Sequence, residues 1–141
     1  MNVDSIKNGI VIDHIKAGNS MELYHFLNLE NQDCSVAIIK NVVSKKMGKK
    51  DIIKIDADID IDLNVLGYID PDSTVNIIKD GKLVKKCNLT LPDRIENVIT
   101  CKNPRCITTV EQDIKHVFKL TDRENRVYRC IYCDSRARED N

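Results

Sequence analysis

The chain has 141 residues, and its 22 basic and 22 acidic side chains leave no formal net charge. It therefore lacks the overall field that draws a protein to nucleic acid or to an anionic membrane. Its length suits one ordinary domain or two small ones. No apolar run approaches the roughly 20 residues of a membrane span, and the start MNVDSIKNG lacks a secretory signal pattern. We therefore expect a cytoplasmic protein, where paired cysteines more often bind metal than form disulfides.

The first strand expected along the chain is GIVIDHI, residues 9–15. Simple alternation places Ile10, Ile12 and His14 on one face and Val11, Asp13 and Ile15 on the other. On this pattern Asp13 and His14 point in opposite directions, so they do not form the hydrogen-bonded acid and base that catalysis needs. A partly buried histidine with a structural partner explains His14 as well as a ligand site does.

The following segments extend this strand into an α+β domain. The expected elements are a helix over NSMELYHFL (19–27), antiparallel strands over CSVAIIKNVV (34–43) and DIIKIDADIDI (51–61), a short helix over LNVLGYI (63–69), and a hairpin over TVNIIKDGKLVKKC (74–87). The hairpin turn falls at Asp80-Gly81, a pair with a strong preference for tight turns. Cys34 and Cys87 lie within strand patterns and read as small buried apolar side chains.

A basic loop joins the second and third strands. Lys45, Lys46, Lys49 and Lys50 are crowded there, and Lys54 interrupts the apolar run IIKI that follows. Such a loop is commonly a solvated one, and a strand lysine often points to solvent. The loop is not a phosphate-binding P-loop, because no glycine lies five residues before Gly48 and Asp51 stands where Ser or Thr is needed.

The character of the chain changes after LTLPDRIENVIT (89–100), and we place a domain boundary between residues 95 and 96. Four cysteines then follow as a Cx4C pair and a Cx2C pair, namely Cys101, Cys106, Cys130 and Cys133. Two close pairs of this kind can converge on one tetrahedral zinc ion, and four thiolates leave no open position for catalysis. A segment of this size cannot bury enough apolar surface alone, so the metal would stabilise its fold. Two disulfides or a rubredoxin-like iron centre remain alternatives.

Several motifs in order along the chain resemble the regulatory chain of aspartate carbamoyltransferase. They are IKNGIVIDHI (6–15), MGKKDIIKI (47–55), STVNII (73–78), LPDRIENVITC (91–101) and the final cysteine pairs. The resemblance implies an N-terminal antiparallel sheet with two helices, ferredoxin-like, over residues 1–95, which binds nucleotides. It also implies a small all-β zinc domain over residues 96–141, which docks onto the catalytic chain.

The same resemblance implies a non-catalytic subunit of pyrimidine biosynthesis that binds CTP, UTP and ATP allosterically. Three regulatory dimers would bridge two catalytic trimers, and one structural zinc would be held by Cys101, Cys106, Cys130 and Cys133. The family's nucleotide site falls on Val3, Asp4, Ser5, Ile6, Val11, Asp13, His14, Lys50, Lys54, Asn76, Ile78 and Lys86. Gly81 stands where the family can have a tyrosine.

Two other classes of protein remain alternatives. A zinc-ribbon module for nucleic acid would use Arg123, Arg126 and Arg129 as a phosphate-binding stripe, but the chain has no net basic charge and few aromatic side chains for stacking. An enzyme that processes nucleotides would need a base and metal-binding carboxylates around the phosphates, and no such group can be assembled from the sequence. We therefore expect no nucleic-acid or membrane partner.

Overall fold

The computed structural model describes residues 6–137, and the chain forms two compact units, Met1–Thr90 and Leu91–Asn141. Val3, Asp4 and Ser5 of the expected nucleotide site lie outside the described residues. The expected boundary between residues 95 and 96 falls inside a short strand that pairs within the C-terminal unit. Within residues 6–137, no helix is long and apolar enough to cross a membrane.

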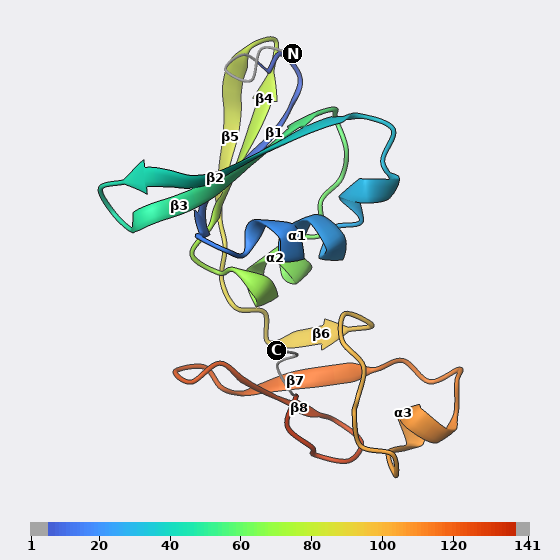
Figure 1. Cartoon of the computed structure of the whole chain (residues 1–141). Coiled ribbons are helices and arrows are strands. Elements are labelled where there is room, and N and C mark those ends of the chain that lie inside the picture. Colours follow the sequence, from blue (N-terminus) through green and yellow to red (C-terminus); the bar gives the residue numbers. More distant parts are fainter. Residues whose placement is uncertain (1–5, 138–141) are drawn as a thin grey trace. The chain divides into compact units, whose positions relative to one another are not determined.

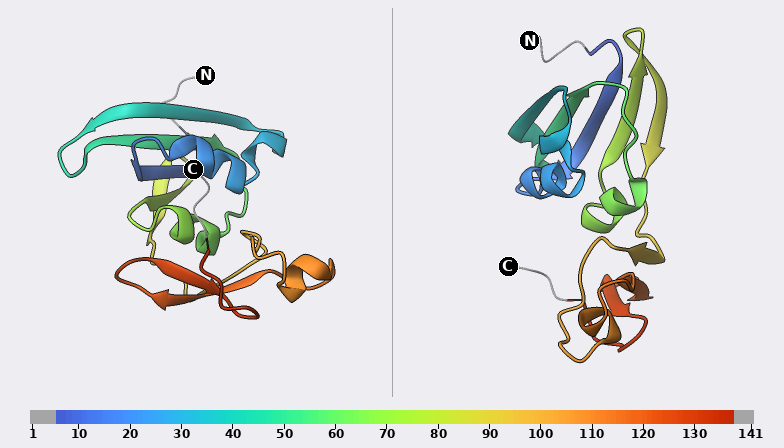
Figure 2. Two further views of the ribbon diagram at one scale, coloured as in Figure 1. Left: turned by 60° about the horizontal axis from the view of Figure 1, so that its bottom comes forward. Right: turned by 90° about the vertical axis from the view of Figure 1, so that its right-hand side faces the viewer.

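The N-terminal unit is an antiparallel sheet with two α-helices on one of its faces (Figures 1 and 2). Its elements are β1 Gly9–Lys16, α1 Ser20–Phe26, the short 3-10 helix η1 Leu29–Asn31, β2 Ser35–Ser44, β3 Gly48–Asp56, α2 Leu63–Ile69, β4 Thr74–Lys79 and β5 Lys82–Asn88. The strand order is β2-β3-β1-β4-β5. The βαββαβ unit from β1 to β4 gives the ferredoxin-like order, to which β5 adds an edge strand. The expected fold class is confirmed.

Alternation along the strands separates a core face from an outer face of this sheet. Ile10, Ile12, Ile53, Ile55 and Val75 are buried in one apolar cluster with residues of both helices. Since neighbours along a strand point to opposite faces, the residues between them point away from the helices. The outer face is therefore built from polar and partly buried side chains of β1, β3 and β4.

A β-bulge in β1 changes the expected pattern at His14. The register with β3 shifts between Ile12 and Ile15, and His14 has a φ of 57°. Ile12 and Ile15 are both completely buried in the core. Asp13 and His14 thus share the place of one outward residue. The expectation that His14 shares a face with Ile10 and Ile12, opposite to Ile15, is wrong. Simple alternation cannot reveal such an inserted residue.

Tight turns and a helix cap fix the ends of several elements. Asp80 and Gly81 both have positive φ, at 52° and 74°, as a two-residue hairpin turn of this hand requires. At the start of β1, a Cβ on Gly9 would lie 2.1 Å from the Ile55 carbonyl oxygen, so only glycine fits this close approach. The Asp62 carboxylate accepts from the amides of Asn64 and Val65 and so caps α2.

The C-terminal unit is a three-stranded antiparallel sheet with one short helix. Its elements are β6 Arg94–Glu96, α3 Ile107–Val110, β7 Val117–Asp122 and β8 Val127–Cys130, with strand order β6-β7-β8. Ile95, Val117, Phe118 and Tyr128 are buried in it. This apolar core is small, and the four cysteines lie beside it in turns and at strand ends, which confirms the expected small β domain.

Candidate metal centre and nucleotide-binding face

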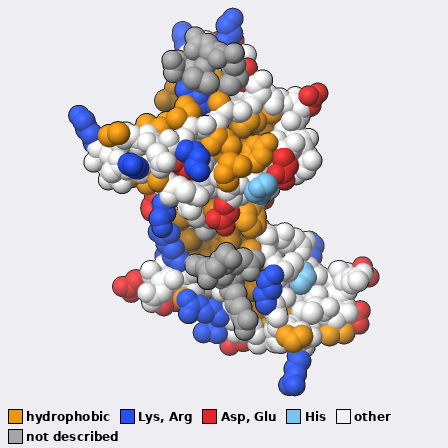
Figure 3. Space-filling model, in the orientation of Figure 1, with side chains coloured by type: hydrophobic (Ala, Val, Ile, Leu, Met, Phe, Trp, Pro, Cys, Tyr) orange, Lys and Arg blue, Asp and Glu red, His pale blue; other side chains and the backbone are white. Residues whose placement is uncertain are grey.

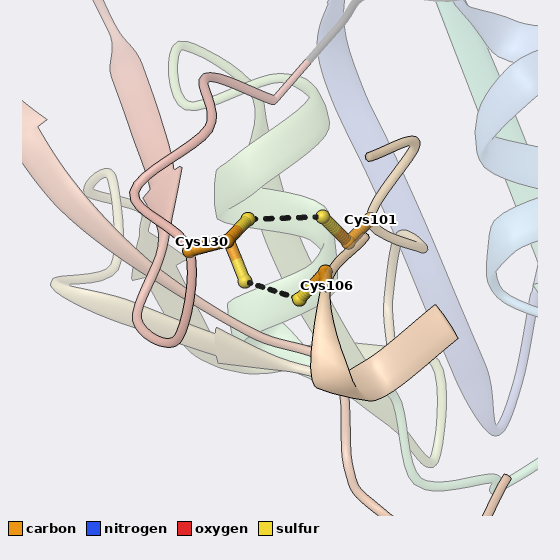
Figure 4. Close-up of side chains that lie close together, drawn as sticks. Cys101, Cys106 and Cys130 are labelled. Atoms are coloured by element: carbon orange, nitrogen blue, oxygen red, sulfur yellow. Dashed lines mark hydrogen bonds between the residues drawn. The ribbon is translucent and has the colours of Figure 1, made fainter. Parts of the chain in front are cut away.

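The four terminal cysteines come together from two loops. Cys101 and Cys106 precede α3, whereas Cys130 ends β8 and Cys133 follows in the next turn. Their sulfur atoms all lie within 4.8 Å of one another, and three of the four residues are buried. Figure 4 shows Cys101 and Cys106 facing Cys130 across a common centre.

The spacing of the sulfur atoms fits a tetrahedral ion rather than two disulfides. Cys101 Sγ lies 3.6 Å from Cys133 Sγ, and Cys106 Sγ lies 3.6 Å from Cys130 Sγ. A disulfide needs about 2.05 Å between its sulfurs. Four sulfurs at about 2.3 Å from a zinc ion lie roughly 3.8 Å apart at the corners of a tetrahedron. The cluster therefore fits one structural zinc ion with a closed ligand set.

The thiol pKa values differ among these cysteines. Burial raises the pKa of Cys101 to about 12 and also raises that of Cys130. Burial acts in the same direction on Cys133, but hydrogen bonds from Ser135 outweigh it and lower its pKa to about 6. Four thiolates this close repel one another strongly, so a divalent cation is what allows all four to be ionised together.

Backbone hydrogen bonds hold both cysteine loops in shape. The Cys106 amide donates to the Asn103 carbonyl at 3.1 Å, and the Asp134 amide donates to the Cys130 carbonyl at 2.9 Å. Asp134 has a φ of 63°, so the chain turns sharply directly after Cys133. Cys34 and Cys87 take no part in this cluster, and both are partly buried against the apolar core of the N-terminal unit.

A row of side chains crosses the outer face of the N-terminal sheet. Val11 pairs with Lys54 of β3 and with Asn76 of β4, and Asn76 pairs with Lys86 of β5. Directly paired residues share a face, so all four side chains belong to the face opposite the helices. The sheet thus brings together four residues of the expected nucleotide site that lie far apart in sequence.

Asp13, His14 and Lys50 continue this group beside the row. Lys50 Nζ lies 2.9 Å from the Asp13 carboxylate, and the His14 amide donates to the same carboxylate at 2.6 Å. Burial alone would raise the pKa of Asp13, but Lys50 and the His14 amide outweigh it and hold the pKa below its usual value. Lys50 lies within β3 rather than in the basic loop, which fixes its position over β1.

Thr74 is a member of this face that sequence reasoning missed. Its hydroxyl lies 3.2 Å from His14 Nδ1, and it pairs with Asp13 across β1 and β4. A buried threonine at the start of a strand carries no sequence signal of such a role. The bulge at His14 is what brings the imidazole to it.

Ile6 and Ile78 lie around Gly9 at the beginning of β1. Ile78 pairs with Gly9, and a Cβ on Gly9 would meet Ile6 Cγ2 at 2.7 Å. The Gly81 amide donates to the Lys7 carbonyl at 2.9 Å, so the β4-β5 turn is bonded to the segment that enters β1. The structure therefore brings together these two residues of the expected nucleotide site.

Two of the three arginines of the nucleic-acid alternative bond to groups inside the C-terminal unit. Arg123 donates to the Leu91 carbonyl and pairs with Asp93 at 2.5 Å, and Arg129 donates to the Asp134 carbonyl. On the face shown in Figure 3, Lys and Arg side chains are mixed with Asp and Glu. These contacts give no support to a phosphate-binding stripe.

Comparison with known proteins matches each of the two units to a family model. Residues 1–90 match the family model of the aspartate carbamoyltransferase regulatory chain, allosteric domain, and residues 93–141 match that of its metal binding domain. The chain is 57% identical to the aspartate carbamoyltransferase regulatory chain of Clostridium tetani over 95% of this chain and 94% of the relative. It is 52% identical to that of Clostridium acetobutylicum over 95% and 92%, and 47% identical to that of Bifidobacterium longum over 98% and 99%. With its allosteric and metal-binding domains, the chain therefore belongs to the family of aspartate carbamoyltransferase regulatory chains, non-catalytic subunits of an enzyme whose catalysis resides on another chain.

Proposed function

We propose that the N-terminal unit binds nucleoside triphosphates on the outer face of its sheet and thereby regulates carbamoyl transfer on the catalytic chain. CTP, UTP and ATP are the proposed effectors. The single observation that carries this proposal is the cross-strand row of Val11, Lys54, Asn76 and Lys86, flanked by Asp13 and His14.

The row has the charge and the width that a triphosphate requires. Lys54 and Lys86 stand three strand spacings apart, about 14 Å at the backbone, so their long side chains can approach one ligand from both ends. Lysine offers a compact charge with three donors, which suits phosphate oxygens. His14 and Lys50 add donors near β1, and Asn76 lies between the two lysines, where it can bridge sugar and phosphates.

The remaining residues suit recognition of the nucleoside. Asp13 can accept from a ribose hydroxyl, since its pKa is low and it stays ionised at neutral pH. Backbone groups of Ile6 and Ile78 provide directional contacts for a base, with Val11 as an apolar neighbour. Val3, Asp4 and Ser5 complete the proposed site. The selectivity between bases would depend on the turn that contains Gly81.

The C-terminal unit is the proposed docking domain for the catalytic chain. Cys101, Cys106, Cys130 and Cys133 would hold the zinc ion there, which stabilises the shape of the surface rather than reacting with a substrate. Pairs of regulatory chains would join through their N-terminal domains. Three such dimers would then bridge two catalytic trimers, in the cytoplasm.

Alanine substitutions on β5 test the nucleotide site with a matched control. Lys86 pairs with Asn76 on the outer face, whereas its neighbour Lys85 pairs with Ile77 of the core side. Lys86→Ala and its control Lys85→Ala each remove one positive charge from the same strand. We expect Lys86→Ala and Lys54→Ala to weaken CTP and ATP binding by roughly 10- to 100-fold, because a charge-assisted hydrogen bond contributes about 1.5–3 kcal/mol.

Isothermal titration calorimetry on the assembled protein measures these affinities. Lys85→Ala should bind both nucleotides with affinities within about twofold of those of the unchanged chain. The Lys85 side chain does not lie on the outer face, so salt screens its charge from a nucleotide bound there. Equal affinities for Lys54→Ala, Lys86→Ala and the unchanged chain would show that the nucleotide binds elsewhere.

A further inference from the structure

Two polar side chains outside the ligand set contact the cysteine cluster directly. Thr108 Oγ1 lies 3.0 Å from Cys106 Sγ, and the threonine is 3% exposed. The amide of Cys101 donates to His116 Nδ1 at 3.1 Å. The two contacts reach one member of each sulfur pair, because Cys101 lies against Cys133 and Cys106 lies against Cys130.

The Thr108 hydroxyl is placed to compensate charge on sulfur. A zinc-bound thiolate has no proton to donate, so the hydroxyl must be the donor in this contact. A divalent ion with four thiolates keeps an excess of negative charge, and Cys106 is 1% exposed, so water is excluded from it. A hydrogen bond to a buried anion stabilises it far more than the same bond in water.

The His116 imidazole holds the first cysteine loop against the sheet. The His116 amide donates to the Asn97 side chain at 3.0 Å, and the Asn97 amide donates to the His116 carbonyl at 2.8 Å. Asn97 has a φ of 55° directly after β6, and β7 begins directly after His116. The ring therefore projects from a fixed backbone position, and its bond to the Cys101 amide fixes where that cysteine enters the cluster.

We propose that Thr108 and His116 are positioning residues of the zinc centre that set how tightly it retains its metal. Thr108 acts through the hydrogen bond to the Cys106 thiolate, and His116 acts through the backbone of Cys101. The proposal rests on the assignment of the four cysteines as zinc ligands. Partners one shell outside a metal's ligands commonly change its affinity by about 10–100-fold when they are replaced.

Paired substitutions in the full-length chain separate these roles from general packing. Thr108→Val keeps the shape and removes the hydroxyl, whereas Thr108→Ser keeps the hydroxyl. His116→Leu removes the acceptor, whereas His116→Asn returns an oxygen acceptor near the position of Nδ1. Thr121→Val is the control, because the Thr121 hydroxyl donates to the Val127 carbonyl within the β7-β8 hairpin instead of contacting a cysteine.

Competition with a chromogenic chelator measures zinc affinity in each variant. We expect Thr108→Val and His116→Leu to hold zinc about 10–100-fold more weakly, and Thr108→Ser, His116→Asn and Thr121→Val to remain within about threefold of the unchanged chain. If Thr108→Val and His116→Leu retain zinc as tightly as Thr121→Val, the proposal is wrong.

Cobalt substitution gives a second readout that depends on local bonding rather than on stability. Removal of a hydrogen bond from thiolate raises the energy of its lone pairs, so the sulfur-to-cobalt charge-transfer band of Thr108→Val should move to longer wavelength. An unchanged band would overturn the role of Thr108 even if that variant folds poorly. Metal analysis of the unchanged chain tests the four-cysteine ligand set separately from the roles of Thr108 and His116. Absence of one tightly bound zinc ion would refute the ligand set itself.

Discussion

Asp51 is a completely buried carboxylate that joins three parts of the N-terminal unit. It lies in β3 and accepts from the amide of Gly18 at 3.1 Å and from the amide of Asn41 at 3.0 Å. Asn41 has a φ of 60° at a register shift in β2, so this one side chain secures both that irregularity and the turn after β1. Its neighbour Lys50 points to the outer face and pairs with Asp13.

We expect Asp51→Asn to lower the free energy of unfolding by about 1–3 kcal/mol. An amide group can satisfy only part of the buried donors that the carboxylate accepts, and an unsatisfied buried donor costs about that amount. Urea unfolding followed by circular dichroism measures the change. Asp56→Asn, at the exposed end of the same strand, is the control and should differ by less than about 0.5 kcal/mol. Equal midpoints for the two variants would contradict this role.

The pH dependence of this effect follows from the pKa of Asp51. Burial alone would raise the pKa of Asp51, but the amide hydrogen bonds outweigh it and hold the pKa below its usual value in the folded chain. A lowered folded pKa contributes stability that is complete above the unfolded pKa, at about pH 5 and higher, and is lost as pH falls through the folded pKa. The stability gap between the unchanged chain and Asp51→Asn should therefore be constant from pH 7 to pH 5 and shrink below about pH 4. A gap that widens on acidification would contradict this sign.

At the scale of elements, the bulge in β1 places side chains of the proposed nucleotide site and strains the backbone there. A φ of 57° at His14 is a conformation that costs an L-residue roughly 1–2 kcal/mol and costs glycine little. The same conformation brings the imidazole to Thr74 on the outer face. We expect His14→Gly and His14→Val to lose nucleotide affinity equally, because both remove the ring.

Stability should separate these two variants. Val is β-branched and cannot adopt the left-handed conformation without strain, so His14→Val should unfold about 1–2 kcal/mol more easily than His14→Gly. Urea unfolding and calorimetry with CTP measure the two properties on the same preparations. If the Val and Gly variants are equally stable, the bulge is not where this strain resides.

Local patterns predicted the elements, and contacts distant in sequence explain what was missed. Alternation and turn residues located the strands of the N-terminal unit, and the spacing of Cys101, Cys106, Cys130 and Cys133 located the metal cluster, because both signals act over short distances. The bulge at His14 depends on register with a strand some forty residues later, so no local pattern contains it. The partners of Asp51 are likewise set by the tertiary fold rather than by neighbouring residues.

At the scale of the whole molecule, the two units have separate proposed functions. Cys130→Ser removes one of four thiolates, and structural zinc contributes on the order of 10–16 kcal/mol to small domains of this kind. We expect the variant to lose zinc and to fail to assemble with the catalytic chain, whereas it should still bind CTP through its N-terminal unit. Analytical ultracentrifugation with the catalytic chain measures assembly, and calorimetry measures binding. A zinc-free variant that still assembles would contradict the docking role of the zinc domain.

Nucleotide control can be measured as the rate of carbamoyl transfer by the catalytic chain assembled with this chain, against CTP concentration at subsaturating aspartate. Allosteric coupling is typically about 1–3 kcal/mol, so the rate should change severalfold on saturation with CTP. Assemblies with Lys86→Ala should show the same change at roughly 10- to 100-fold higher CTP, and those with Lys85→Ala should match the unchanged chain. An assembly whose rate does not depend on CTP or ATP, or whose response is the same with Lys86→Ala, would contradict the claim that nucleotides on this face of the sheet control the enzyme.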